Sequence, residues 1–538
     1  MVLPPAAASS VKTPKPRRIG AKPGSRPRTR PPFTLDVPAR AELLASILPP
    51  ELAALLKNAN LAQVPPEILA GMVLPGVPLA NAVLTAFAYV LQPQLLDDLF
   101  DRHRGKSYED TLSFSTFVTL IRDALILYKG SARQSFQRAI EQGDLPTCQE
   151  AVYGKLRRIP LPVSLAFIEE LTKLIRGLRP KDARMDPLPK SLDAMTIVIL
   201  DGKQIKDVAK RLKPVRGKPG KVVGGKVLAF YLPAEGLVVS MAADPDGEAN
   251  DIRLMPDAIP RARAQIAGIR LWVADRQFCD LNQPVRLTEE GDHFLVRRSL
   301  KMGFHADPNR PARKSVDAQG RTMIDEWGWI GSPKEKRRRY VRQIHLVRVG
   351  EEDIYVVTDL LDEVAYPPED LLVVYLHRWE IERVFQQITE VFSLQRLVGS
   401  TPQATVFQAS FCMVLYNLMQ LVRAFVSIGR EATAAVESVE SVSVEQLFLD
   451  VQRELTALLV LFPAASLASW FTAEWSREGT MERLRNLLGV VWTPRYIKAV
   501  NKTPRPKLKK AKCSGAHTSV HKVLEEERKK RLAVRKDH

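Results

Sequence analysis

Two short apolar runs, each ending at an aspartate, constrain this chain more than any other feature. The first run is Thr196 to Leu200, followed by Asp201 and Gly202; the second is Ile269 to Ala274, followed by Asp275. Apolar, partly β-branched runs bounded by turn residues are typical of buried strands. If these strands are parallel neighbours in an α/β sheet, both carboxylates lie at one edge. One strand-ending aspartate can also simply cap a turn, so the argument rests on the pair.

The segments around these runs predict a sheet, and the regions before and after it in the sequence are predicted to be helical. Between them lie two strand-like runs joined by a Pro-Ala-Glu-Gly turn, at 226–232 and 236–241, and then a helical stretch at 248–266. Residues 290–362 are again rich in strand patterns. Helical spacing dominates from about 40 to 180, and again from about 368 to 500. We therefore predict an α/β core that a β-rich insertion interrupts, flanked by helical regions.

A third acidic residue is predicted from helical geometry. At about 100° per residue, Tyr375, Arg378 and Glu382 fall on one narrow face, whereas Glu380 points away. Two or three carboxylates are suitable ligands for a hard divalent cation, and a guanidinium beside them suits a phosphate. The same three residues might instead form an ordinary solvated face of the helix.

Positive charge gathers in a few places along the chain. The net charge is +19, and most of it lies in residues 1–32, with eight basic residues and no acid, and in 501–538, with thirteen basic and four acidic residues. Residues 203–226 contain nine basic residues and one acid. A further cluster lies in the predicted insertion: Lys334, Lys336, Arg337, Arg338, Arg339 and Arg342. Such clusters favour a polyanionic partner, although solubilising tails and solvated hairpins have the same composition.

The residues singled out above resemble those of one known family, the DDE transposases of the insertion-sequence-four group. The resemblance lies in Leu200-Asp201-Gly202, in Ala274-Asp275-Arg276-Gln277-Phe278, and in the Tyr-x2-Arg-x3-Glu pattern of Tyr375, Arg378 and Glu382. The run Val414 to Leu418 also looks like the family's helix after the catalytic glutamate. The resemblance covers roughly residues 192–422.

The resemblance implies an RNase H-like α/β core with a β-strand insertion and with helical amino- and carboxyl-terminal regions. The organisation expected along the chain begins with a basic, proline-rich arm (1–36) and a helical domain suited to DNA binding (37–185). The two parts of the core (190–289 and 366–425) flank the insertion (290–365). A helical region suited to dimerisation (426–500) and a basic tail (501–538) follow.

The resemblance also implies a catalytic triad of Asp201, Asp275 and Glu382 that holds Mg²⁺, with Mn²⁺ as a substitute. In that chemistry water cuts a transposon end, and the freed 3′ hydroxyl then attacks another phosphodiester. Tyr375 and Arg378 would position DNA at the scissile phosphate. The other candidate DNA contacts are Lys203, Arg276, Lys336, Arg337, Arg338 and Arg339. Trp327 and Trp329 are candidates either for stacking on an unpaired base or for packing.

The expected partners are double-stranded DNA, as terminal inverted repeats and as target, and a second copy of the chain. Four scattered cysteines indicate a reducing compartment, and we expect a cytoplasmic, nucleoid-associated protein. Two uncharged stretches, 68–96 and 455–473, are interrupted by prolines and are expected to be buried helices without a membrane role.

One position departs from the family pattern. The signature ends with a lysine seven residues after the glutamate, and here that residue is Thr389. Two alternatives to an active transposase therefore remain: a catalytically lapsed, DNA-binding descendant, and a stand-alone metal-dependent nuclease that cuts DNA but joins no ends.

Overall fold

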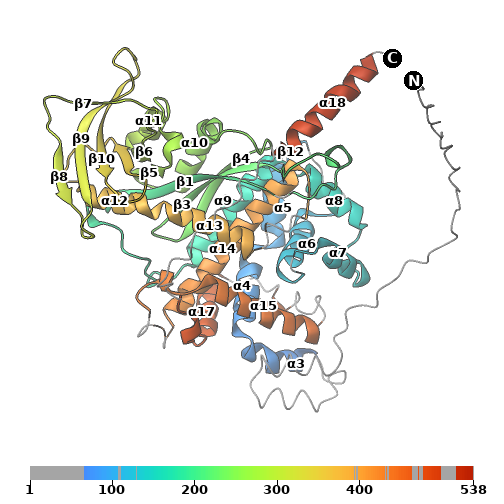
Figure 1. The fold of residues 1–538 in the computed structure, drawn as a ribbon. Helices are drawn as coiled ribbons and strands as arrows, with labels where there is room; N and C mark the ends of the chain where they lie inside the picture. Colours follow the sequence, from blue (N-terminus) through green and yellow to red (C-terminus); the bar gives the residue numbers. More distant parts are fainter. Residues whose placement is uncertain are drawn as a thin grey trace, which may run out of the picture.

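The computed structural model describes residues 66–536 apart from short internal segments. Those segments are 107–110, 129, 207, 393, 395–397, 430–431, 433–435, 463–469, 472–475 and 499–516. The predicted basic arm and the first part of the predicted tail lie outside the described residues. The fold is mixed α/β, with one large sheet and many helices, which confirms that part of the prediction (Figure 1).

A ten-stranded sheet forms the centre of the α/β half of the chain. Its strand order is β4-β3-β1-β5-β6-β11-β10-β9-β7, with β8 paired to β9. β1 is parallel to β5 and β5 to β6, whereas β3 and β4 form an antiparallel hairpin beside β1. The first five strands are β1 (Thr196–Gln204), β3 (Lys226–Leu232), β4 (Leu237–Asp244), β5 (Arg270–Ala274) and β6 (His293–Arg297).

The remaining strands continue this sheet and do not form a separate body. β6 lies inside the segment predicted as an insertion, yet it pairs with β5 on one side and with β11 on the other. The strands beyond it are β7 (Phe304–Ala306), β8 (Arg313–Val316), β9 (Thr322–Ile330), β10 (Arg339–Leu346) and β11 (Ile354–Thr358). Figure 1 shows them at one end of the sheet, away from the helical half of the molecule.

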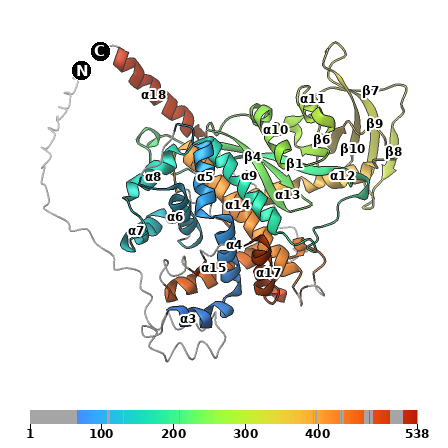
Figure 2. The same ribbon diagram turned by 180° about the vertical axis from the view of Figure 1, so that it is seen from behind.

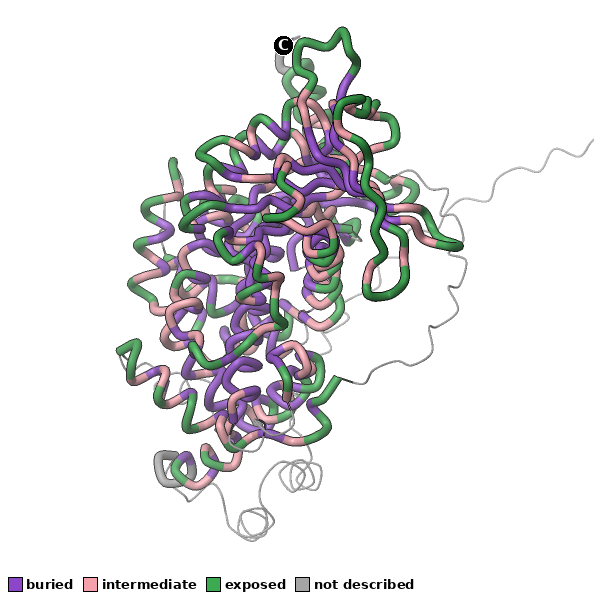
Figure 3. The backbone as a smooth tube through the Cα atoms, turned by 90° about the vertical axis from the view of Figure 1, so that its left-hand side faces the viewer, coloured by how far each residue is buried: buried purple, intermediate pink, exposed green. Residues whose placement is uncertain are grey.

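Alternation along the strands divides the core between the two faces of the sheet. On β1, Ile197 and Ile199 belong to one apolar cluster, and Val198 and Leu200 belong to the other. The second cluster is covered by α10 (Met255–Gln265), which packs on β4. The first face is covered by helices α9, α12, α13 and α14, whose bounds are Leu161–Leu178, Pro368–His377, Trp379–Glu390 and Pro402–Ser427. Figure 3 shows this buried layer running through the middle of the chain trace.

Helix α14 is the central helix of the molecule, and 25 of its 26 residues are buried. It packs against α8, α9, α13 and β4, and Figures 1 and 2 place it in the middle of the fold. Asn417 attaches it to the sheet: its amide donates to the Val238 carbonyl (2.7 Å), and its oxygen accepts from the Val238 amide (3.0 Å). These bonds satisfy β4 backbone groups that would otherwise be buried without partners.

Among the described residues, α14 is also the one helix long and apolar enough to cross a membrane. The apolar window of α14 is 100% buried inside the protein. A second candidate arises only if Ala70–Gly76 and Pro78–Val90 count as one span, and these two are bent by 103°. That bend falls at the prolines and glycine that interrupt the first uncharged stretch.

The amino-terminal helices pack around α9 and α14 and against two helices from the end of the chain. They are α3 (Pro66–Val73), α4 (Pro78–Val90), α5 (Pro93–His103), α6 (Phe114–Ile126), α7 (Ala132–Glu141) and α8 (Gln149–Arg158). α4 packs on α15 (Val444–Leu461) and α17 (Arg477–Leu488). Helices from the first and last thirds of the described chain therefore pack against each other.

The last described segment forms a second, two-stranded sheet with an earlier part of the chain. Strand β12 (Thr518–Ser519) pairs in parallel with β2 (Val222–Val223), within the basic segment that follows β1. The Ser519 hydroxyl donates to Asp246 (2.6 Å). The basic helix α18 (Val520–Lys536) then projects away from the body of the protein (Figures 1 and 2).

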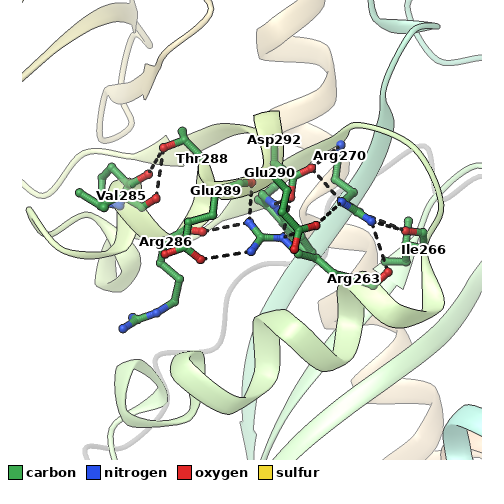
Figure 4. Close-up of polar contacts among 11 residues, drawn as sticks. Arg263, Ile266, Arg270, Val285, Arg286, Thr288, Glu289, Glu290 and Asp292 are labelled. Carbon is green, nitrogen blue, oxygen red and sulfur yellow. Dashed lines mark hydrogen bonds and ion pairs between the residues drawn. The ribbon is translucent and has the colours of Figure 1, made fainter.

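A buried ionic cluster aligns α10 with the first residues of β5 and β6. Asp292 is fully buried and accepts from Arg263 (2.8 Å), Arg270 (3.2 Å) and the Trp272 indole (3.1 Å). Figure 4 shows both guanidiniums converging on this carboxylate. Because a buried charge left without its partner is costly, this cluster holds the helix and the two strands in one arrangement.

The contact of Glu454 on α15 with the start of α4 predicts how stability depends on pH. Glu454 accepts a hydrogen bond from the Ala80 amide (2.8 Å), and burial raises its pKa from 4.5 to about 7. A raised folded-state pKa favours the folded protein below pH 4.5, and that advantage disappears as pH rises through about 7. Between pH 5 and pH 8 we expect the free energy of unfolding of wild type to fall by about 2–3 kcal/mol more than that of Glu454→Gln. Urea unfolding of both proteins at the two pH values measures this, and equal losses would contradict it.

Candidate active site

The pairing of β1 with β5 places two aspartates side by side. Ile199 is the register partner of Val273, and two residues further along each strand stand Asp201 and Asp275. Asp201 was expected just past the end of its strand, and that detail is wrong. β1 continues to Gln204 because its other neighbour, β3, pairs with it antiparallel as far as Lys226. Asp201 therefore lies where the parallel pairing stops while the strand continues.

Strand alternation turns both aspartates toward the same helices. Asp201 has the parity of Ile197 and Ile199, and Asp275 has the parity of Leu271 and Val273. All four apolar residues belong to the cluster on the face that α12 and α13 cover. α13 carries Glu382 in its first turn and packs on β1. The three acids that the sequence singles out thus lie on the same side of the sheet, beside α13.

Arg378 lies between these carboxylates. Its Nη2 donates to Glu382 Oε1 (3.0 Å), and its Nη1 lies 3.7 Å from Asp201 Oδ2. The Arg378 and Tyr375 side chains are almost fully buried. Little of either side chain is exposed, and their contact with DNA stays a prediction. Their geometry fits a role in positioning the carboxylates.

The helical segment that carries these residues is divided into two helices at Arg378. α12 ends at His377 and α13 begins at Trp379, while Arg378 keeps helical dihedral angles. The helical contacts persist across the join, since Arg378 reaches Glu382 four residues on. Glu380 points elsewhere and bonds His377 (2.5 Å), as the helical geometry predicts.

The groups around Asp201 shift its pKa in opposite directions. Burial raises the pKa of Asp201 to about 6; Arg378 and the Gly202 amide act against this, and Glu382 and Asp275 add to it. Each aspartate has one oxygen held by the following backbone amide, at 2.8 Å for Asp201 and 2.6 Å for Asp275. A positive charge among the three acids would relieve their repulsion.

The three carboxylates are suitable ligands for a hard divalent cation, but in this structure they lie too far apart to share one. Across the described residues, no three His, Cys, Asp or Glu side chains lie close enough together to share a metal ion. The guanidinium of Arg378 supplies the positive charge instead. Carboxylate oxygens are the ligands that Mg²⁺ and Mn²⁺ prefer, so Asp201, Asp275 and Glu382 fit such an ion chemically if Arg378 moves aside.

A fourth acid, Asp251, lies against the site and was not predicted from the sequence. Asp251 is buried, forms an ion pair with Lys226 (2.7 Å) and accepts from the Gln277 amide (2.5 Å). Its carboxylate packs against Gly202, where an added Cβ would lie 2.2 Å from Asp251 Oδ1. Asp251 thus links β1, β3 and the turn after Asp275. The only local signal is the small residue after Asp201.

A lysine from β1 lies beside the helix position where the family lysine is missing. Thr389 bonds the Phe385 carbonyl (2.7 Å), and Lys203 Nζ lies 5.7 Å from the centre of the Phe385 ring. Burial and Lys206 lower the pKa of Lys203, while Asp201, Glu390 and Glu382 oppose that shift. Lys203 therefore places a cation along the same face of α13.

The predicted DNA contacts in the turn between β9 and β10 differ in exposure. Lys336, Arg337 and Arg338 are exposed there, and Arg339 begins β10 and donates to Thr288 (2.8 Å). Arg276 is also exposed, and lies 3.5 Å from Glu352. Arg342 was grouped with them, and that is wrong: it is fully buried against Asp325 (2.6 Å).

The two tryptophans of the insertion are packed. Trp327 is fully buried and its indole donates to the Leu361 carbonyl (3.0 Å), so base stacking by Trp327 is excluded in this structure. Trp329 is partly exposed, with its ring 4.8 Å from that of Tyr340 and 5.3 Å from the Arg338 guanidinium. Trp327 is therefore a packing residue, as the alternative prediction held, and much of the Trp329 side chain is packed as well.

Comparisons with known proteins point to one class. Residues 193–418 match the family described as Transposase DDE domain, a span that contains all three acids. The chain is 21% identical over 192 residues to y4zB of Sinorhizobium fredii, whose name assigns it provisionally as a transposase. That match covers 35% of this chain and 53% of y4zB, so the chain spans about half the length of that relative.

A solved structure is also similar, at a greater distance. It is the synaptic complex of piggyBac transposase with hairpin DNA, with 12% identity and a TM-score of 0.32 over 76% of this chain and 85% of that one. A TM-score this low does not establish a shared fold. The domain match and the sequence relative support a transposase function for this chain.

The contact between Gly202 and Asp251 predicts the effect of one methyl group. Gly202→Ala should destabilise the protein by about 1–3 kcal/mol, because the new Cβ overlaps a buried carboxylate that is held from both sides. Gly71→Ala in α3 is the matched control, since its Cβ meets nothing within 4 Å and alanine favours a helix. Urea unfolding measures both. Unchanged stability of Gly202→Ala would show that Asp251 does not lie against β1.

Proposed function

We propose that this protein is a DDE transposase of the insertion-sequence-four group with an RNase H-like core. It would cut DNA at the ends of its element and join the freed 3′ hydroxyl to a target. One observation carries the proposal: register and alternation bring Asp201 and Asp275 together on the face from which Glu382 approaches. The order β4-β3-β1-β5-β6, with β1, β5 and β6 parallel, supports the proposed core.

The three acids are proposed to hold the divalent ion, Mg²⁺ or Mn²⁺, on which the reaction depends. When bound, such an ion would activate the attacking oxygen and offset charge on the phosphodiester. The residues of the chain do the rest: Arg378 balances the charge of Asp201 and Glu382, and Tyr375 packs behind it. The network of Asp251, Lys226 and Gln277 keeps the ends of β1 and β5 in place.

The DNA is proposed to lie across basic groups around this site. Lys203 would supply the cation that Thr389 lacks, because it lies over Phe385 near the acids of α13. The exposed residues Lys336, Arg337 and Arg338, with Arg276 and Arg339, would contact phosphates further out. Such contacts provide affinity that decreases with salt, without choosing a sequence.

Two further assignments follow from the proposed reaction. Pairing two element ends favours a homodimer in the DNA complex, with the helical region at 426–500 as a proposed contact. A chromosomal substrate places the protein in the cytoplasm at the nucleoid. A strictly monomeric mass with end DNA bound would contradict the dimer.

Purified protein, DNA carrying the inverted repeats that flank the gene, and Mg²⁺ test the reaction directly. Wild type should yield both cleaved ends and strand-transfer products on sequencing gels. Asp201→Asn, Asp275→Asn and Glu382→Gln should each lower both by about a hundredfold or more, because each removes a charge that the reaction needs. Glu380→Gln is the control, since Glu380 points away from the site.

Other results would favour the other candidates. Cleavage without any joined product would indicate a stand-alone nuclease. Binding of end DNA with no cleavage in Mg²⁺ or Mn²⁺ would indicate a lapsed descendant, as Thr389 suggests. Lys203→Met should weaken end binding in an active enzyme, and unchanged binding would remove Lys203 as the substitute for the family lysine.

A further inference from the structure

A large pocket lies where the amino-terminal helices meet the segments that carry the catalytic acids. Its volume is about 750 Å³. One wall comes from the start of α7 and from α8, and the other from the basic segment after β1 and from the start of α14. Residues 398–401 of this wall lie between α13 and α14, and Ala404 belongs to the first turn of α14. Both parts of the second wall therefore continue elements that carry Asp201 or Glu382.

The pocket is lined by more positive than negative charge. Arg133, Arg157 and Arg211 line it, together with one acid, Glu150. All three arginines are exposed, and within the described ranges none of them makes an ion pair with an acid. Burial raises the pKa of Tyr153 between them, and Arg211 and Arg133 oppose that shift, so two guanidiniums lie near its hydroxyl.

The amino-terminal end of a long helix and an unpartnered hydroxyl also lie at this pocket. α14 begins at this pocket, with Thr401 as its cap residue accepting from the Ala404 amide. Pro402 has no amide hydrogen and the Ala404 amide donates to Thr401, so it is the dipole of the helix that favours an anion here. Ser400, 8% exposed, lines the pocket, and its buried hydroxyl has no hydrogen-bond partner among the described residues. Polar atoms buried in this way normally have a partner.

We propose that this pocket binds a phosphodiester group of the DNA backbone, at a site separate from the three acids. Guanidiniums, a helix amino terminus and a hydroxyl are the groups that bind phosphate oxygens. The proposal rests on the proposed function, since it takes DNA as the ligand. It gives the amino-terminal helices a defined part in DNA binding: α7 and α8 would hold the strand against the catalytic half.

Fluorescence anisotropy with a labelled generic duplex tests the proposal, because phosphate contacts do not depend on sequence. Arg157→Gln should weaken binding about three- to tenfold and should reduce the slope of log affinity against log salt by about 0.9. Arg158→Gln is the matched control: it removes the same charge from the next residue of α8, which does not line the pocket. Ser400→Ala should also weaken binding while leaving the salt slope unchanged.

The outcomes separate this proposal from the proposed function. If wild type binds the duplex and Arg157→Gln binds it equally well, the pocket does not hold DNA, although the transposase assignment stands. If wild type binds no DNA, the proposed function itself fails. Inorganic phosphate tests for a site that binds free anions. If phosphate raises the melting temperature of wild type but not of Arg157→Gln, while both proteins bind DNA equally well, the pocket holds free anions. That result would overturn the proposal.

Discussion

The parallel pairing of β1 with β5 determines where the candidate active site of this protein lies. It brings Asp201 beside Asp275, and the alternation of the strands turns both toward α12 and α13. The other features of the core depend on that pairing. The Asp292 cluster aligns the first residues of β5 and β6, and Asp251 links the far ends of β1 and β5. The central helix α14, attached to β4 through Asn417, supports the same face from behind.

The site concentrates negative charge at a cost to stability. Asp201 is buried beside two other acids, and its pKa is raised to about 6, so ionising it in the folded protein is unfavourable. Arg378 reduces that cost and occupies the position among the acids that a divalent ion would need. Competing charge of this kind is common at functional sites.

Much of the site could be predicted from the sequence because its signals are local. Apolar runs ending at Asp201 and Asp275, and helical spacing from Tyr375 to Glu382, need no knowledge of distant contacts. The parts that could not be predicted depend on partners far along the chain. β1 continues past Asp201 because of β3, and Arg342 is buried because Asp325 lies opposite it. Asp251 begins a short 3-10 helix inside the stretch predicted as helical, and nothing in that pattern places its side chain against Gly202.

The central claim is that Asp201, Asp275 and Glu382 together hold a divalent ion. The most direct measurement is anomalous diffraction from crystals of the protein with Mn²⁺. The account predicts one or two peaks within about 2.5 Å of oxygens from all three acids, with the Arg378 guanidinium displaced from between Asp201 and Glu382. Crystals that hold Mn²⁺ elsewhere, or that hold none at saturating concentration while Arg378 remains between the acids, would contradict it.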